Sequence, residues 1–304
     1  MMKKYGKKII KKFLILCLFA LLIFSSIVGK IIHDAPEISP RKLLEEVRNM
    51  PYAIAYEEIP PKMIAATLAA EDHRFYQHHG IDYIRIIQAI LYDIYYGKLV
   101  YGASTIPMQL SKNHFTGFEK TFRRKILDMY YATVIEKELT KEEILECYLN
   151  TIGLSKGIVG VREGAKTFFN RDANQLSTAE CVYLIGITNW PAHYTPILLE
   201  QVMTPKENHL FVTWHTGEAK KDVKLWESLW KEGKISEEIY QLLLSGNIDL
   251  WSWKMNPDTK YRQEYILKRM LETKSISQEE YEAYLKENIQ LEPVNLKILN
   301  GKIQ

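Results

Sequence analysis

Apolar residues recur every three or four positions through much of the chain, and this spacing is typical of amphipathic helices. The pattern is strongest from residue 62 to about residue 199, where few runs alternate and β-branched clusters are short. One helix is predicted to begin at Pro61 and to end at Glu71 and Asp72. Its inward face is predicted to include Met63, Ile64, Thr67 and Leu68. We therefore expect a mainly α-helical domain over residues 62–200.

Beyond residue 200 the helical period weakens, but a repeat is visible there. Residues 225–248 read LWESLWKEGKISEEIYQLLLSGNI, and residues 266–289 read ILKRMLETKSISQEEYEAYLKENI. Both runs fit one helix-turn-helix unit in which Ser236 or Ser277 caps the second helix, with a full capping box only in the second copy through Glu280. We expect residues 201–304 to form a helical appendage that carries no catalytic residues of its own.

The amino-terminal region combines a cluster of lysines with an apolar run. Six lysines occur in residues 1–12, and the run from Phe13 to Gly29 is apolar apart from two serines. A helix of that length reaches about 26 Å, near the lower limit for crossing a bilayer. A cleaved signal peptide also has a charged start and a short apolar core, but no small-x-small cleavage site stands out here. We favour an uncleaved transmembrane anchor over residues 13–32.

The flanks of this run indicate how the chain is oriented. By the positive-inside rule, residues 1–12 form a cytoplasmic basic segment and everything after Lys30 lies on the outer side. Residues 33–61 contain five prolines and are predicted to form a linker with a short helix around residues 41–48. The expected location is the bacterial cytoplasmic (inner) membrane, with a single pass.

Charge and cysteine content exclude several other classes. The formal net charge is +3, and removing the six amino-terminal lysines leaves −3, so no basic face for nucleic acid is indicated. The three cysteines, Cys17, Cys147 and Cys181, are odd in number and far apart, which argues against a disulfide framework and a zinc site. The histidines near residue 78 lack a metal-binding pattern. We expect no metal site and no required cofactor, and leave a divalent cation open.

The acids Glu71 and Asp72 are the first candidates for chemistry. The negative end of a helix dipole and burial both favour the protonated form of a carboxyl group, which suits a general base that works near neutrality. An isolated Glu-Asp pair is more often a solvated helix end. In EDHRFYQHHGID, however, the pair is followed at set offsets by Phe75, His78, Gly80 and Asp82.

A second candidate lies on the helix predicted around residues 122–133. On a helical wheel, Arg124, Lys125 and Asp128 share the polar face. An Arg-Asp pair at this spacing is common and contributes only about 0.2–0.5 kcal/mol, which is the favoured interpretation for an isolated helix. Beside Lys112 and Arg123, the same face has the fixed cations that a departing pyrophosphate needs.

The run from Glu71 to Asp82 resembles the first motif of the family 51 glycosyltransferases, Glu-Asp-x-x-Phe-x-x-His-x-Gly-Ile-Asp. The family includes monofunctional peptidoglycan glycosyltransferases and the glycosyltransferase half of class A penicillin-binding proteins. Its second motif, Gly-Gly-Ser-Thr-Ile-Thr-Gln-Gln-Leu-x-Lys-Asn, is similar to residues 102–113. This sequence departs from it at Ala103, Pro107 and Met108.

Three further motifs follow in the family's order. The third, Arg-Lys-x-x-Glu-x-x-x-Ala, is similar to residues 124–132, with Asp128 where the family has its second catalytic glutamate. Residues 141–150, KEEILECYLN, resemble the fourth motif. The spacing of the fifth is matched by Gly157, Gly160, Ala165 and Phe169. The resemblance covers about residues 55–200.

The resemblance implies a lysozyme-like helical glycosyltransferase domain and names its site. The domain would polymerise lipid II into β-1,4-linked glycan strands with inversion, releasing undecaprenyl pyrophosphate. Glu71 would be the catalytic base, and Asp128 the second catalytic residue. The implied substrate-binding residues are Asp72, Ser104, Thr105, Gln109, Lys112, Asn113, Arg124 and Lys125. From the residues alone, Ser104 is equally well placed to cap a helix.

The expected partners follow from the same resemblance: lipid II, the growing glycan chain, the membrane and cell-wall synthesis proteins, with no nucleic acid. Because aspartate is one methylene shorter than glutamate, the carboxylate of Asp128 could fall roughly 1 Å short, which can cost ~100-fold in rate. Met108 lacks a hydrogen-bonding amide, and Pro107 lacks a backbone donor. A degenerate protein that binds lipid II without turnover, as a cell-wall scaffold, is therefore the alternative. A hydrolase of the same fold class ranks last.

Overall fold

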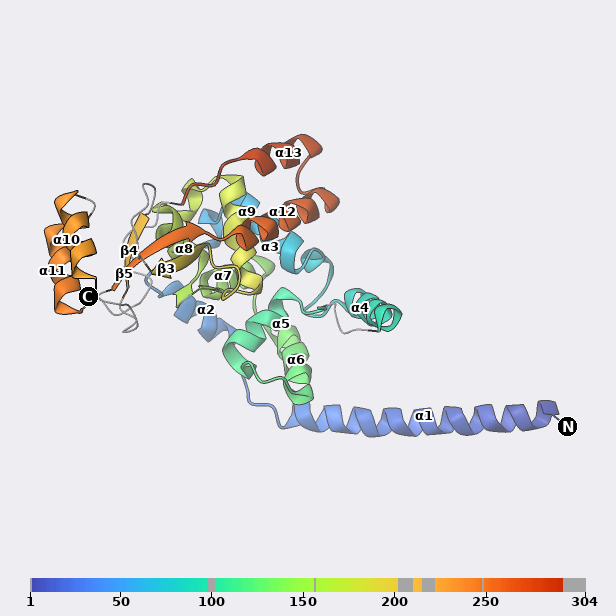
Figure 1. Ribbon diagram of the computed structural model, residues 1–304. Helices are drawn as coiled ribbons and strands as arrows, with labels where there is room; N and C mark the ends of the chain where they lie inside the picture. Colours follow the sequence, from blue (N-terminus) through green and yellow to red (C-terminus); the bar gives the residue numbers. More distant parts are fainter. Residues whose placement is uncertain are drawn as a thin grey trace. The chain divides into compact units, whose positions relative to one another are not determined.

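The computed structural model describes residues 2–97, 102–155, 157–201, 210–214, 222–233, 235–247 and 249–291 (Figure 1). The chain forms two compact units. Unit 1 comprises residues 1–44 and 74–144, and unit 2 comprises residues 45–73 and 145–304. Most of the described residues lie in helices, so the prediction of a mainly α-helical fold is confirmed.

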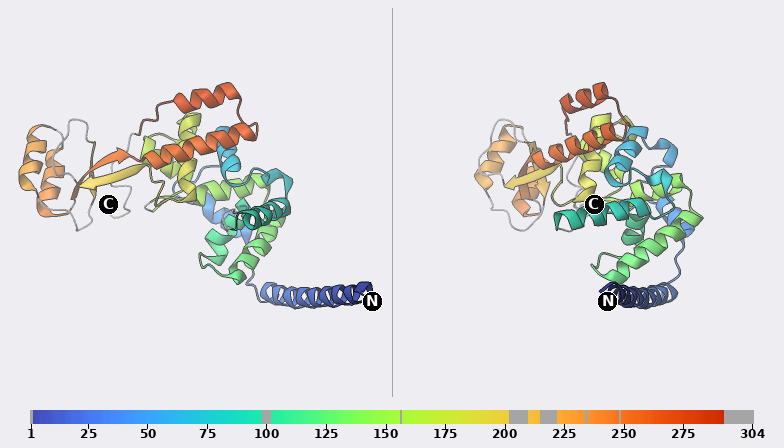
Figure 2. Two further views of the ribbon diagram at one scale, coloured as in Figure 1. Left: turned by 45° about the vertical axis from the view of Figure 1, so that its right-hand side comes forward. Right: turned by 90° about the vertical axis from the view of Figure 1, so that its right-hand side faces the viewer.

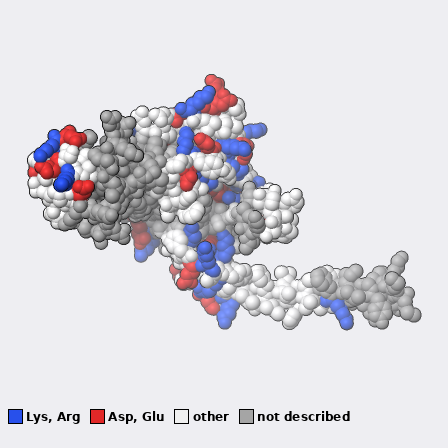
Figure 3. Space-filling view, in the orientation of Figure 1, with Lys and Arg blue, Asp and Glu red and all other residues white. Residues whose placement is uncertain are grey.

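Unit 1 begins with the long helix α1 (Met2–His33), drawn in blue in Figure 1. The stretch Leu14–His33 is long and apolar enough to cross a membrane, and none of its residues is fully buried, although the helix packs against α6. The face drawn in Figure 3 shows a white, uncharged stretch along this helix. The helix continues through Gly29 without a break, as the sequence predicts.

The rest of unit 1 is a set of shorter helices around α6 (Phe122–Glu138), which packs against α5 (Ile106–Ser111) and α1. A π-helix (Lys112–Thr116) follows α5 directly. The remaining elements that begin in unit 1 are α2 (Pro40–Arg48), η2 (Phe75–Gln77), α4 (Tyr83–Tyr96) and α7 (Lys141–Thr151). The short linker helix predicted around residues 41–48 is thus confirmed as α2.

Helix α4 presents most of its apolar side chains to the surface. Asp82 caps its first turn, and Gly97, in the left-handed conformation, ends it. Among its residues only Ala89 is buried. Its large exposed apolar side chains include Tyr83, Ile84, Ile87, Ile90, Leu91, Ile94 and Tyr95. A soluble surface helix normally turns such a stripe toward the core, so this face of α4 lacks an apolar cover within the described residues.

Unit 2 is built on α3 (Pro61–Glu71), which has the predicted bounds and packs against α9 (Thr178–Gly186) and α12 (Pro257–Glu272). The buried face of α3 differs slightly from the prediction, because Met63 and Thr67 are buried while Ile64 and Leu68 are only half-buried. Ala66 and Ala69 are buried as well. Smaller elements are η1 (Tyr56–Glu58), β1 (Gly153–Ser155), β2 (Ile158–Val159), α8 (Val161–Phe169), η4 (Ala173–Gln175) and η5 (Ile187–Asn189).

A three-stranded antiparallel sheet is the main departure from the predicted helical appendage. It consists of β3 (Ile197–Gln201), β4 (Leu210–Trp214) and β5 (Asp249–Met255), in the order β3-β5-β4 (Figure 2). Leu199 pairs with Trp253 across one edge of β5, and Val212 pairs with Trp251 across the other. The helical appendage predicted for residues 201–304 thus also contains strands that the sequence pattern did not predict, because part of its backbone pairs between strands instead of along a helix.

Both predicted helix-turn-helix units are present. The first consists of α10 (Val223–Lys231) and α11 (Glu237–Ser245), and the second of α12 and α13 (Gln278–Lys286). Ser236 and Ser277 are the N-caps, and only Ser277 forms a full capping box, with Glu280. The last position of the first repeat, Ile248, lies outside the described residues.

The two repeats differ in what they pack against. Helices α10 and α11 share a small core of their own, made by Leu225, Trp226, Leu229, Ile235 and Leu243. Helix α12 instead packs along α9 and α3, and Gln263 Nε2 donates a hydrogen bond of 2.7 Å to the carbonyl of Ala179. Lys62 of α3 also pairs with Glu280 at 3.0 Å. The second repeat is therefore part of the core of unit 2 and not a separate appendage.

Candidate active site

The two predicted acids lie at the carboxyl end of α3, in unit 2. Glu71 is 8% exposed and Asp72, the C-cap of the helix, is fully buried. The hydroxyl of Thr188 lies 3.4 Å from Oε1 of Glu71 and 2.9 Å from the carbonyl of Ile185. The hydroxyl of Thr188 is therefore one partner of the Glu71 carboxyl group, at the long end of the hydrogen-bond range.

Burial and the charges of these two acids raise the pKa of Tyr148 on α7. Its ring is buried, and burial, together with the negative charges of Glu71 and Asp72, raises the pKa of its hydroxyl well above the usual value. The phenol therefore stays neutral and adds no further negative charge beside the two carboxylates. Two residues further along α7, the side chain of Asn150 accepts a hydrogen bond from the backbone nitrogen of Ile54 at 2.8 Å and donates one to the carbonyl of Ile54 at 2.9 Å.

The second group of predicted residues lies on α6 and the π-helix of unit 1. Asp128 is 2% exposed, and both of its oxygens are engaged. Thr116 donates to Oδ1 at 2.5 Å, and Arg124 forms an ion pair with Oδ2. Burial raises the pKa of the Asp128 carboxyl, while the Thr116 hydrogen bond and the cations of Arg124, Lys125 and Lys112 partly offset this rise.

Three cations therefore act on one buried carboxylate. The side chain of Arg124 is itself held by the carbonyl of Glu119 through Nε at 2.5 Å. Lys112 lies over the ring of Phe118, with Nζ 5.4 Å from the ring centroid. A single carboxylate cannot neutralise three cations, so the cluster has net positive charge. It is a physically reasonable site for an anion such as a phosphate.

Lys125 joins the second and third motifs. Its ammonium group donates to the hydroxyl of Ser104 at 2.8 Å. Burial lowers the pKa of Lys125, and the neighbouring cations Arg124 and Lys112 lower it further, whereas Asp128 opposes the change. Removing this ammonium group from water costs free energy, which contact with an anionic ligand would recover.

Gly80 is the point where the first three motifs meet. Its carbonyl accepts a hydrogen bond from Thr105 at 2.6 Å, and a Cβ at Gly80 would lie 2.6 Å from the carbonyl oxygen of Ala132. The backbone of Gly80 also has φ of +82°, which favours glycine. These contacts give the spacing of the motif residues in this chain a structural reason, because α5 and α6 approach the same backbone turn.

Thr105 and Ser104 exchange the roles that the sequence suggests. The N-cap of α5 is Thr105, whose hydroxyl accepts from the backbone of Met108 at 3.3 Å, so the cap falls one residue later than the Ser104 predicted. Thr105 is also fully buried. Its hydroxyl holds the start of α5 and the turn at Gly80. Ser104 is half-buried and bonded to Lys125, so it is the hydroxyl nearer to the cation cluster.

The altered positions Pro107 and Met108 point into the protein core. Pro107 lies in the first turn of α5, where a backbone N–H has no partner within the helix, so proline removes no helical hydrogen bond. Met108 is 1% exposed and packs as an apolar side chain. Both substitutions are therefore accommodated by packing, and neither removes a polar group from an exposed surface.

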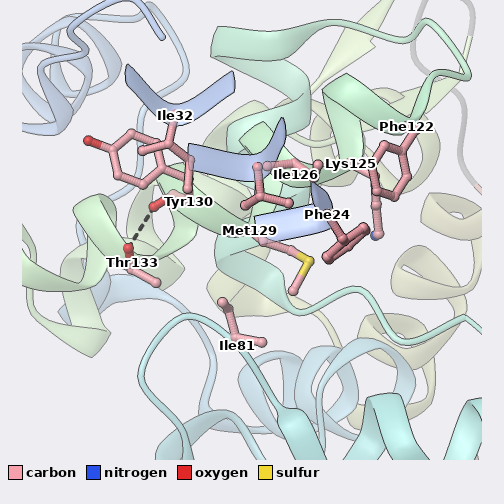
Figure 4. A pocket seen from close by; sticks show the side chains of 10 residues that line it. Phe24, Ile32, Ile81, Phe122, Lys125, Ile126, Met129, Tyr130 and Thr133 are labelled. Atoms are coloured by element: carbon pink, nitrogen blue, oxygen red, sulfur yellow. Dashed lines mark hydrogen bonds between the residues drawn. The ribbon is translucent and has the colours of Figure 1, made fainter. Parts of the chain in front are cut away.

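An apolar cavity of about 410 Å³ lies beside the cation cluster in unit 1. Figure 4 shows Phe24 and Ile32 of α1 facing Ile126 and Met129 of α6 across it. The other lining residues are Val28, Ile81, Phe122, Lys125, Tyr130 and Thr133. Lys125 is the only cation among them, so the cavity has one charged wall and an otherwise apolar lining.

The predicted site residues thus form two groups, one in each unit. Unit 2 holds Glu71 and Asp72, and unit 1 holds Ser104, Thr105, Gln109, Lys112, Asn113, Arg124, Lys125 and Asp128. Gln109 and Asn113 are half-buried on α5 and the π-helix. Sequence reasoning missed Thr116, because nothing in the helical period predicts a π-turn. It also missed the apolar face of α4, which the spacing of isoleucine and tyrosine in YIRIIQAILYDIYY could have revealed.

Comparison with known proteins places this arrangement in a family. The sequence profile of the family described as "Transglycosylase" matches residues 41–213, which is more than half of the chain. A protein of Cupriavidus necator that is provisionally named a transglycosylase is 39% identical over 51% of this chain and 66% of its own length. Penicillin-binding protein 1A of Escherichia coli is 40% identical over 50% of this chain and 18% of its own length.

Penicillin-binding protein 1A of Haemophilus influenzae matches a longer part. It is 33% identical over 82% of this chain and 23% of its own length. Its crystal structure covers 79% of this chain and 18% of that protein at 19% identity, with a TM-score of 0.34, which supports no structural argument. The chain spans less than two thirds of the length of these relatives. The match over residues 41–213 nevertheless shows that the chain belongs to the transglycosylase family, the family 51 glycosyltransferases that its motifs resemble.

Proposed function

We propose that the protein is a peptidoglycan glycosyltransferase that polymerises lipid II into β-1,4-linked glycan strands. The observation that carries the proposal is the positive cluster of Lys112, Arg124 and Lys125 beside an apolar cavity, in a chain of the transglycosylase family. An anionic phosphate on a long apolar chain is complementary to both parts of this site, the cations and the apolar cavity. Lipid II and undecaprenyl pyrophosphate belong to that chemical class.

In the proposed reaction, the 4-hydroxyl of the acceptor sugar attacks the anomeric carbon of the donor. Glu71 takes the hydroxyl proton as the new carbon–oxygen bond forms. The bond between the anomeric carbon and the pyrophosphate breaks, and its electron pair leaves with undecaprenyl pyrophosphate. Attack from the face opposite the leaving group converts an α-linked donor into a β-linked product.

The cations are proposed to bind the pyrophosphate and to stabilise the charge that develops as it leaves. Asp128 would act through them, because its own oxygens are occupied by Thr116 and Arg124. Asp72, Gln109, Asn113 and Ser104 remain proposed substrate contacts. We propose no required cofactor, since three cations already surround the site, and loss of activity on chelation with EDTA would contradict this.

The membrane is a further proposed partner. The apolar stretch Leu14–His33 of α1 suits a single transmembrane pass, with the amino-terminal lysines in the cytoplasm and the catalytic domain outside. The cavity between α1 and α6 would then open toward the lipid, where the polyprenyl chain of the substrate lies. The exposed apolar face of α4 supports contact with the bilayer surface. Cell-wall synthesis proteins are proposed as partners from the family alone.

Binding of lipid II without turnover is the second candidate function. The observation that favours it is the closed environment of Asp128, whose oxygens are both bonded within the protein. A carboxylate held in this way cannot itself exchange a proton with substrate unless these bonds break. The intact acid at Glu71 favours turnover instead.

Polymerisation of fluorescent lipid II by the detergent-solubilised full chain distinguishes these functions. The wild type is expected to produce a ladder of glycan strands, and Glu71→Gln is expected to produce none while it still binds lipid II. Thr151→Val, a substitution on α7 that removes a hydroxyl bonded to the carbonyl of Cys147, serves as a control and should remain active. Binding of lipid II by the wild type without any polymer would support the scaffold function.

A further inference from the structure

The hydroxyl of Thr116 has an unusual position for a threonine near a helix end. It does not bond to a carbonyl of its own turn, as many threonines in helices do, but donates to Oδ1 of Asp128, twelve residues away, at 2.5 Å. The direction of this hydrogen bond is defined, because an ionised carboxylate has no proton to donate. Thr116 and Arg124 therefore bind one oxygen of Asp128 each.

The π-helix gives the hydroxyl its direction. The backbone nitrogen of Gly117 donates to the carbonyl of Lys112 at 3.0 Å, a bond that spans five residues where an α-helix spans four. The wider turn rotates the residue at its end relative to α5. Gly117 follows with φ of +78°, a conformation that favours glycine. The chain thus leaves the helix immediately after placing Thr116 against α6.

We propose that Thr116 is a positioning residue that completes the environment of the short acid Asp128 and so fixes the cations that bind the pyrophosphate. The inference rests on the proposed function. Aspartate reaches one methylene less far than the family's glutamate, and a single bond to Arg124 would leave one buried oxygen without a partner. The Thr116 hydroxyl supplies that partner. With both oxygens held, Asp128 can adopt one orientation, and Arg124, which it binds, is fixed as well.

The charges around Asp128 agree with this role. The charged groups that lower the pKa of Asp128 are Arg124 and Lys125 on α6 and Lys112 on the π-helix. Helix α5, which packs against α6, has no ionisable side chain. Burial raises the pKa of Asp128, and the bond from Thr116 is the largest of the interactions that oppose this rise. Without the hydroxyl, the carboxyl would take up its proton at a higher pH, and the ion pair with Arg124 would be lost there.

Two variants separate the hydroxyl from the shape of the side chain. Thr116→Val keeps the branched shape and removes the donor, whereas Thr116→Ser keeps the donor. In polymerisation of fluorescent lipid II, Thr116→Val is expected to lower the rate about tenfold near pH 7, the usual effect of losing one hydrogen bond to a charged group. The acid limb of its pH–rate profile should move to higher pH by about one unit. Thr116→Ser should keep the wild-type rate and the wild-type acid limb. The control Thr151→Val should change neither the rate nor the acid limb.

A second measurement does not depend on activity. Thermal unfolding of the full chain in detergent is compared for Thr116→Val in the wild type and in an Asp128→Ala background. The expected loss in Tm is about 2–4 °C in the wild type and clearly less in the background without the carboxylate. Equal losses in both backgrounds would overturn the inference even if the protein polymerises lipid II. A smaller loss in Tm in the Asp128→Ala background, in a protein that makes no polymer, would instead support the Thr116–Asp128 contact and contradict the proposed function. A Thr116→Ser variant that behaves like Thr116→Val in the pH–rate profile would also overturn the positioning role.

Discussion

The ammonium group of Lys125 lies 2.8 Å from the hydroxyl of Ser104, so the second and third family motifs are joined by one hydrogen bond within unit 1. Lys125 also forms a wall of the apolar cavity between α1 and α6. The same side chain therefore links the polar part of the candidate site to its apolar part. This position suits a residue that binds the phosphate of a lipid-linked substrate.

Loss of the Lys125 charge is expected to weaken turnover strongly. Lys125→Met keeps most of the apolar stem but removes the ammonium group, and it should lower kcat/KM for lipid II by about 10–100-fold. Lys125→Arg keeps the charge and should retain more activity. Steady-state polymerisation rates of the two variants give their values of kcat/KM. Full activity of Lys125→Met would exclude the residue from the phosphate site.

The same lysine predicts an alkaline limit of activity. Burial lowers the pKa of Lys125 below the ordinary value of 10.5. The charged form, which is proposed to bind the phosphate, is present below this lowered pKa and is lost as the pH rises through it. The wild-type rate should therefore fall at a pH below 10.5, and Lys125→Arg should move this limb upward, because arginine stays charged. If the alkaline limb is unchanged in Lys125→Arg, a group other than Lys125 must cause it.

Restoring the family's glutamate at residue 128 is expected to harm the protein. The side chain of Asp128 is 2% exposed and has partners on both oxygens, so Asp128→Glu adds a methylene to a filled site. Such overpacking typically costs about 1–3 kcal/mol of stability. Adding Thr116→Ala to Asp128→Glu should recover part of that loss, because it removes the hydroxyl and a methyl group. Denaturant unfolding gives the free energy of unfolding of both variants. An Asp128→Glu variant that is more stable than the wild type would contradict the closed geometry around residue 128.

Gly80 and Gly97 provide a matched pair for the meeting point of the motifs. Both have positive φ, +82° and +64°, but a Cβ at Gly80 would lie 2.6 Å from the carbonyl oxygen of Ala132, whereas a Cβ at Gly97 meets nothing within 4 Å. Gly97→Ala should cost about 1–2 kcal/mol from backbone strain alone. Gly80→Ala should cost at least about 2 kcal/mol more, because the helix backbone must move. Equal losses in an unfolding experiment would show that the approach of α6 to Gly80 is not tight.

The cavity beside Lys125 predicts a dependence on the length of the lipid. Met129→Trp places a larger side chain into the cavity and should raise KM about tenfold for lipid II with a full polyprenyl chain. An analogue with a short chain should be affected much less. Tyr261→Trp, on the exposed surface of α12, is the control for the size of the added side chain. An equal effect of Met129→Trp on both substrates would show that the chain does not enter this cavity.

The sequence predicts those parts of the fold that are encoded by neighbouring residues. The bounds of α3 follow from Pro61 at its start and the acids at its end, and the caps Ser236 and Ser277 follow from a local motif. The sheet was missed, although the alternation of Trp251, Trp253 and Met255 in β5 is a period of two. The strands β3 and β4 have only five residues each, and such short runs carry little periodic signal.

The site was predicted less completely because it depends on contacts between distant segments. The helical wheel placed Arg124, Lys125 and Asp128 on one face, which the structure shows as a cluster. It could not predict the hydroxyl of Thr116, whose direction depends on a π-turn, or the cap at Thr105 instead of Ser104. The apolar cavity is formed by α1 and α6, which are far apart in the sequence.

Glu71 is proposed to be the base of a glycosyl transfer. The most direct test is the polymerisation of fluorescent lipid II by the full chain and by Glu71→Gln, with lipid II binding measured in parallel. Removing a general base typically lowers the rate by about 10²–10⁴-fold. The wild type is expected to produce glycan ladders, and Glu71→Gln is expected to show a loss of that size while it still binds lipid II. Ladders of equal intensity from the two proteins would contradict it.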